Sequence, residues 1–111
     1  MLRNAEAVAR IQQKYDYLIN YSSDDPNAPI DPLGYVDSNG DNLVHIAAQL
    51  GDVDTISFLV DAGMDVNIQG DLGSTALHSA YDSGHRGAAE FLLAHGASAT
   101  IENDFGKLPG A

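Results

Sequence analysis

The chain has 111 residues, of which 44% are hydrophobic, and its formal net charge at pH 7 is −11. A chain of this length buries one core, and the absence of cysteine excludes disulfides and thiolate chemistry, so we expect a single small domain. Because no apolar run reaches membrane-spanning length and the start lacks the apolar region of an export signal, we expect a cytoplasmic location.

The N-terminal part of the chain predicts a helix followed by a loop. Within residues 4–20, apolar residues recur at helical spacing, namely Val8, Ile11, Tyr15, Leu18 and Ile19. Residues 21–32 then carry Ser-Ser-Asp-Asp-Pro and two further prolines, which favour irregular structure. We therefore expect residues 1–36 to form a terminal capping helix and a long loop.

From Asp37 onward the sequence repeats with a period of 33 residues. The repeated positions are Gly40, Gly73 and Gly106, Gly51 and Gly84, Gly63 and Gly96, and His45 and His78. Self-similarity at such a period is typical of stacked structural units. We expect one unit over residues 37–69, a second over 70–103, and the start of a truncated third over 104–111.

Each unit predicts a first helix with a small, apolar inward side. The helix follows an oxygen-bearing residue, Asn42 or Thr75, which can accept hydrogen bonds from free backbone amides. It ends at Gly51 or Gly84. The inward residues are Val44, Ala47 and Ala48 in one unit and Leu77 and Ala80 in the other.

A second helix follows in each unit. Asp52 can cap the first of these helices, and Asp54 places negative charge near its amide end, where the helix dipole favours it. Gly63 and Gly96 close the two helices, and a polar stretch leads to the next turn. The apolar positions are Ile56, Leu59 and Val60, and then Ala89, Leu92 and Leu93.

Residues 74–80 read Ser-Thr-Ala-Leu-His-Ser-Ala, which differs by one residue from the Thr-Pro-Leu-His-x-Ala string of the ankyrin repeat. With the 33-residue period, the chain resembles an ankyrin-repeat protein over about two thirds of its length. The resemblance implies an all-α solenoid of stacked helix-turn-helix units with β-turn tips. Departures at Asn42, Tyr81, Gly70 and Thr100 leave the glycines and core apolar positions intact.

The resemblance also implies a concave face, formed by the tips and the first helices, that binds other proteins. The positions that correspond to it are Ser38, Asn39, Asp41, Gln49, Leu50, Asp71, Leu72, Ser74, Tyr81, Asp82, Ser83, Asp104, Phe105 and Lys107. Leu72, Tyr81 and Phe105 are larger and less polar than a solvated tip requires, which indicates anchor side chains. The alternative is that Tyr81 packs between helices and Phe105 covers the open end.

The histidines favour structural roles. His45 and His78 occupy equivalent places, where the resemblance implies hydrogen bonds to the backbone of adjacent turns. His85 and His95 are isolated and do not converge like the three or four ligands of a metal site.

Catalytic and metal-binding patterns are missing. Asp37, Asn39 and Asp41 resemble the opening of a calcium loop, but Asn42 stands in place of the required glycine and Ala48 in place of the bidentate glutamate. No nucleophile elbow, phosphate loop or dinucleotide fingerprint occurs. We therefore expect no enzyme activity, no catalytic residue, no cofactor and no metal.

Charge narrows the choice of partner. Between Tyr15 and His85 there are twelve aspartates and no lysine or arginine. Such a field repels nucleic acid and anionic membranes and attracts basic proteins, although it also serves solubility. The sequence predicts a non-catalytic protein-interaction module whose partner carries a basic patch. One alternative is an acidic immunity or inhibitor protein that neutralises a basic toxin or nuclease, and another is self-association through the open C-terminal end.

Overall fold

The structure is a computed structural model that describes residues 9–11, 13–15, 36–37 and 39–110. Two helix hairpins make up most of it: α3 (Leu43–Leu50) with α4 (Val53–Asp61), and α5 (Ala76–Asp82) with α6 (Arg86–Ala94). Residues 9–11 and 13–14 are also helical, and η1 (Asp71–Gly73) is one 3-10 turn between the hairpins. The described residues contain no strand beyond an isolated bridge between Val36 and Asn42, so the predicted all-α fold is confirmed.

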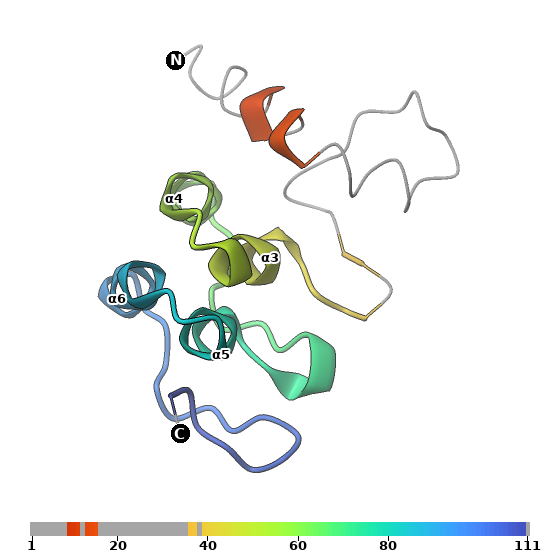
Figure 1. Cartoon of the computed structure of the whole chain (residues 1–111), viewed down its shortest axis with the longest axis vertical. Helices are drawn as coiled ribbons and strands as arrows, with labels where there is room; N and C mark the ends of the chain where they lie inside the picture. The colour runs from red at the N-terminus through yellow and green to blue at the C-terminus, as the bar shows by residue number, and fades with distance from the viewer. Residues whose placement is uncertain (1–8, 12, 16–35, 38, 111) are drawn as a thin grey trace.

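The helices form two layers (Figure 1). α3 packs against α5 in one layer, and α4 packs against α6 in the other. The turns before α3 and α5 project on the side of these two helices, away from α4 and α6. The tips and the first helices therefore share one side of the molecule.

The predicted caps begin both first helices. The Oδ1 atom of Asn42 accepts hydrogen bonds from the amides of Val44 and His45, at 3.0 and 3.2 Å. The Thr75 hydroxyl accepts from the amide of His78 at 3.4 Å. The first amides of a helix have no hydrogen-bond partner within the helix, and here the side chains of Asn42 and Thr75 supply one. This explains why the two helices begin after these residues.

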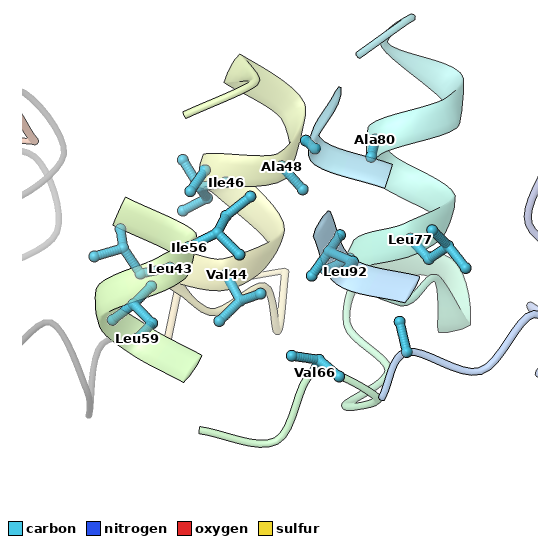
Figure 2. Packing of buried hydrophobic residues seen from close by; sticks show 14 of the residues in the cluster. Leu43, Val44, Ile46, Ala48, Ile56, Leu59, Val66, Leu77, Ala80 and Leu92 are labelled. Carbon is cyan, nitrogen blue, oxygen red and sulfur yellow. The ribbon is translucent and has the colours of Figure 1, made fainter. Parts of the chain in front are cut away.

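The hydrophobic core lies between the two layers (Figure 2). Its largest fully buried aliphatic residues are Leu43, Val44, Ile56, Leu59, Leu77 and Leu92. The predicted inward residues of α3 and α5 are all buried, and Val60 packs partly buried against the core. Leu93, the last of the apolar positions listed for α6, is 40% exposed and lies outside this core. Leu92 faces the core, and the next residue on the helix is turned toward the outside.

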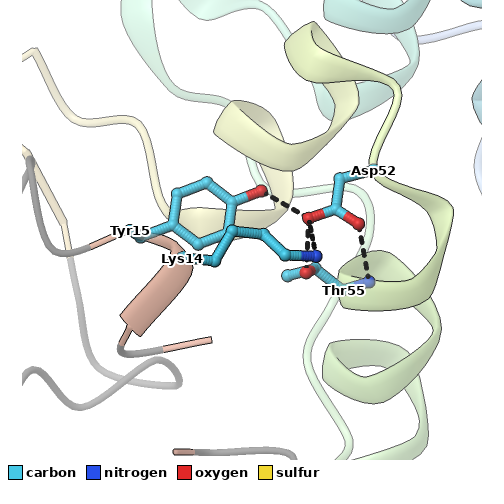
Figure 3. Close-up of polar contacts among 4 residues, drawn as sticks. All are labelled: Lys14, Tyr15, Asp52 and Thr55. Atoms are coloured by element: carbon cyan, nitrogen blue, oxygen red, sulfur yellow. Dashed lines mark hydrogen bonds and ion pairs between the residues drawn. The ribbon is translucent and has the colours of Figure 1, made fainter. Parts of the chain in front are cut away.

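A polar clasp joins the N-terminal helical residues to α4 (Figure 3). The Tyr15 hydroxyl and the Lys14 ammonium each donate to Oδ2 of Asp52 at 2.9 Å, and the Thr55 hydroxyl donates to the same atom at 2.6 Å. Asp52 also accepts from the Thr55 amide and so caps α4 as predicted. Burial raises the pKa of Asp52, but the hydrogen bonds outweigh this effect and hold the pKa below its ordinary value of 3.8.

Part of the N-terminal prediction lies outside the described residues. Ile11 and Tyr15 are buried in the core. Val8, Leu18, Ile19 and the loop expected over 21–32 are not described, so the division at residue 36 stays a prediction. Within the part of the chain that is described, no helix has the length and apolar character needed to cross a membrane.

Candidate functional site

Two buried histidines hold the tip turns against the helices. The Nδ1 atom of His45 accepts from the Asn42 amide at 3.0 Å, so the Nε2 atom carries the proton and donates to the Ile68 carbonyl at 2.8 Å. His78 makes the equivalent bonds, to the Thr75 amide at 3.0 Å and to the Lys107 carbonyl at 2.9 Å. The predicted structural role of both histidines is confirmed.

Neighbouring tips are also bonded to one another. The Asp41 carboxylate accepts from the amide of Asp71 at 2.8 Å, and the amide of Asp104 donates to the Leu72 carbonyl at 2.9 Å. Asp41 is only 7% exposed. The sequence predicted it as a contact residue, but its carboxylate is engaged in holding the next tip and lies at the base of that tip.

Leu72 has an unusual backbone conformation. Its φ is 56° and its ψ is 26°, which makes it the one non-glycine residue with positive φ in the described part of the chain. Residues with a Cβ atom are disfavoured in this left-handed region by about 1–2 kcal/mol. Leu72 is nevertheless 54% exposed, so its burial compensates little for the strain. The sequence predicts Leu72 as a tip residue but gives no sign of this conformation.

A first hollow of about 230 Å³ lies between the tips and the first helices. Its lining residues are Asp41, Gln49, Asp71, Leu72, Ser74, Ser79, Asp82 and Ser83. All of them except Ser79 were predicted from the resemblance to the ankyrin repeat. The described lining therefore contains three carboxylates and neither lysine nor arginine.

A second hollow of about 220 Å³ adjoins the first. It is lined by Leu72, Ser74, His78, Asp82, Asn103, Phe105, Lys107 and Leu108. Leu72, Ser74 and Asp82 line both hollows. Three residues of this lining were not predicted from the sequence, namely His78, Asn103 and Leu108. Leu108 could have been found from the sequence, because it is an apolar residue directly after the predicted third turn.

Four further predicted contact residues that the structure describes line neither hollow. Asn39, Leu50, Tyr81 and Asp104 are exposed, and Ser38 lies outside the described residues. Tyr81 lies beside the C-terminal segment, because a Cβ atom on Gly110 would be 3.4 Å from its ring. This neighbour is not a helix, and Tyr81 is 39% exposed, so its packing between helices stays a hypothesis. Phe105 is 67% exposed and so covers little.

The other histidines are apart from the two hollows. His95 stacks on Phe91 with ring centroids 4.0 Å apart, and its Nδ1 atom lies 2.8 Å from the Phe91 carbonyl oxygen. His85 lies half-buried against Gly51. In the described part of the chain, no three side chains of the metal-binding types are grouped to hold an ion.

Comparison with known proteins points to one family. A family model described as ankyrin repeats in three copies matches residues 7–103. The ADP-ribosylation factor GTPase-activating protein AGD4 of Arabidopsis thaliana is 39% identical over 67 residues, which cover 60% of this chain and 9% of the relative. Protein phosphatase 1 regulatory subunit 27 of Homo sapiens is 31% identical over 77 residues, which cover 69% of this chain and 50% of the relative.

The NF-kappa-B inhibitor cactus of Drosophila melanogaster is 39% identical over 56 residues, which cover 50% of this chain and 11% of that protein. The chain therefore spans half or less of each of these three relatives. Two of the three are named as a regulatory subunit or an inhibitor of another protein.

Proposed function

This chain belongs to the ankyrin-repeat family, whose repeats are protein-interaction modules, and from that membership we propose that it is a non-catalytic module that binds a partner protein. The proposed contact surface is the side formed by the tips and by α3 and α5. The partner carries a basic patch and is neither nucleic acid nor membrane, and the proposed location is cytoplasmic.

The observation that carries the proposal is the charge of the first hollow. Asp41, Asp71 and Asp82 line it, and the described lining holds no lysine or arginine. The whole chain has a net charge of −11 at pH 7, so the electric field of the whole chain has the same sign as that of the three aspartates in the hollow. Complementary charge steers association and selects partners of the opposite sign.

A second candidate function is that of an acidic inhibitor, which would neutralise a basic toxin or nuclease by presenting carboxylates in place of phosphates. The twelve aspartates between Tyr15 and His85 support it. The two functions differ in their response to salt. An inhibitor of this kind binds tightly with an association rate that falls steeply as salt rises, whereas an interaction module binds modestly with weak salt dependence.

The test is a pull-down from a lysate of the source organism at low and at high salt, with captured proteins identified by mass spectrometry. The control is the double variant Asp71→Lys and Phe105→Ala, which reverses one charge and removes one exposed ring at the tips. We expect a basic protein to be captured by the natural chain and lost with the variant. Unchanged capture by the variant would exclude the proposed surface.

The identified partner then decides between the two functions. Its association and dissociation rates are measured over a range of salt concentrations by surface plasmon resonance. A steep fall in association rate together with very slow dissociation would favour the inhibitor. A shallow salt dependence with fast dissociation would favour the module.

A further inference from the structure

We infer that the two hollows together hold one extended segment of the partner, with a lysine or arginine side chain in the first and an apolar side chain in the second. The inference rests on the proposed protein-binding function and adds the chemistry of the bound segment. The pair of hollows is called the tip groove below, and its shared residues are Leu72, Ser74 and Asp82.

The size of each hollow favours single side chains. The volumes are about 230 and 220 Å³. Pockets that bind small molecules are usually larger, about 300–1,000 Å³. Because the hollows adjoin and share three lining residues, neighbouring side chains of one segment can enter both.

The lining of the first hollow matches a cation. Asp71 and Asp82 are exposed and line this hollow together with the engaged carboxylate of Asp41, and the serines of the lining add hydroxyl oxygens that can accept hydrogen bonds. A guanidinium or ammonium group has several donors and no acceptor, so it can satisfy such a set of acceptors. An anionic side chain would be repelled there.

The lining of the second hollow is different. Leu72, Phe105 and Leu108 present apolar surface, and all three are exposed. Lys107 is the one lysine or arginine in the described lining, and it disfavours a second cation at this end. An aromatic or aliphatic side chain would cover apolar surface that water now contacts. The groove therefore distinguishes its two ends by charge and by polarity.

Two of the residues shared by the hollows, Leu72 and Asp82, occupy positions where they lower the stability of the fold. Leu72 has the left-handed backbone conformation that glycine adopts more easily. Asp82 is the last residue of α5, where the helix dipole disfavours negative charge. Solubility alone would not require an exposed leucine in a strained turn. Residues that oppose stability at a surface hollow are typical of contact with a ligand.

The test selects short random linear peptides, displayed on phage, against the immobilised chain. We expect enriched peptides to pair a lysine or arginine with an aromatic or aliphatic residue a few positions away. Synthetic versions are then titrated against Leu72→Gly and Asp82→Asn by fluorescence anisotropy. Each variant is expected to weaken binding about tenfold, while its melting temperature stays equal or rises, so that unfolding cannot explain the loss.

Two control variants are matched to these changes. Leu93→Ala removes a leucine that is 40% exposed on α6, in the layer that does not form the proposed contact surface. Asp61→Asn neutralises the last residue of α4, as Asp82→Asn does for α5. Both controls are expected to bind the peptides as tightly as the natural chain.

Several outcomes would overturn the inference. They are the absence of enriched peptides, enriched peptides without the paired side chains, and equal binding by the groove variants and the controls. Binding of arginine amide as tight as that of the peptides would identify a small cation as the occupant instead. If the lysate pull-down yields a partner while the peptide test fails, the tip groove is wrong and the proposed function stands.

Discussion

Gly51 and Gly84 lie one period apart and offer a matched pair of substitutions by alanine. Their φ angles are +70° and +77°, so the backbone strain of an added Cβ atom is nearly the same at both positions. Their surroundings differ. A Cβ atom on Gly51 would lie 2.6 Å from Nδ1 and 2.8 Å from Cγ of His85, whereas a Cβ atom on Gly84 would meet nothing within 4 Å.

The expected losses of stability follow from these distances. The left-handed conformation disfavours alanine by about 1–2 kcal/mol, and the reduced freedom of the unfolded chain offsets about 0.4–1 kcal/mol of that. Gly84→Ala should therefore lower the free energy of unfolding by about 1 kcal/mol. Gly51→Ala adds an overpacked contact, which typically destabilises by about 1–3 kcal/mol, for a total of about 2–4 kcal/mol.

Urea unfolding followed by circular dichroism measures both free energies. A third variant, His85→Ala combined with Gly51→Ala, should recover the excess loss, because the imidazole that the Cβ atom meets is gone. His85 makes no side-chain capping bond to α6, so its own removal should have a small effect. Equal losses for the two glycine variants, or no recovery without the imidazole, would refute the packing argument.

Three further substitutions test other parts of the structure. His45→Ala should lower the free energy of unfolding by about 2–4 kcal/mol, because it leaves a buried amide without a partner and breaks the bond to the next turn; thermal unfolding should show almost no change for the exposed His95→Ala, and similar losses for both would contradict the structural role. Asp52→Asn should destabilise by about 1 kcal/mol at pH 7. Burial raises the pKa of Asp52, yet hydrogen bonds hold it below 3.8, so the charged form stabilises the fold above pH 3.8 and this contribution is lost as pH falls through the folded pKa. Natural chain and variant should therefore converge in acid when unfolding is measured against pH, and a difference that persisted there would count against the clasp. Leu59→Ala should destabilise by about 2–5 kcal/mol by opening a cavity, whereas Leu93→Ala should cost less than about 1 kcal/mol, and calorimetry that ranked them the other way would disprove the assigned core.

Local signals made much of the fold predictable. Asn42 and Thr75 precede the first helices as capping residues, and Asp52 caps α4. Because the sequence repeats every 33 residues, each capping or glycine signal occurs twice, which makes the prediction of each short helix more certain than one occurrence would. The lining of the first hollow was predictable for the same reason, since it combines tip and first-helix positions of successive units.

Tertiary contacts decided what the sequence could not show. Leu93 continues the apolar spacing of α6, but Leu92 is the residue that faces the packed neighbours α4 and α5, and Leu93 is exposed. The burial of Asp41 depends on an amide 30 residues later, to which no local pattern points. The left-handed conformation of Leu72 was unpredictable because glycine is the usual residue there.

The bonds that support the tips are made largely by buried histidine rings and main-chain atoms. Ile68 and Lys107 are held through their carbonyl oxygens by histidine rings, and Leu72 is bonded through its own carbonyl. The turn is therefore held in place whichever side chain occupies an exposed tip position such as Phe105. Evolution can therefore change ligand preference by replacing exposed tip side chains, while the hydrogen bonds that hold the turns stay the same.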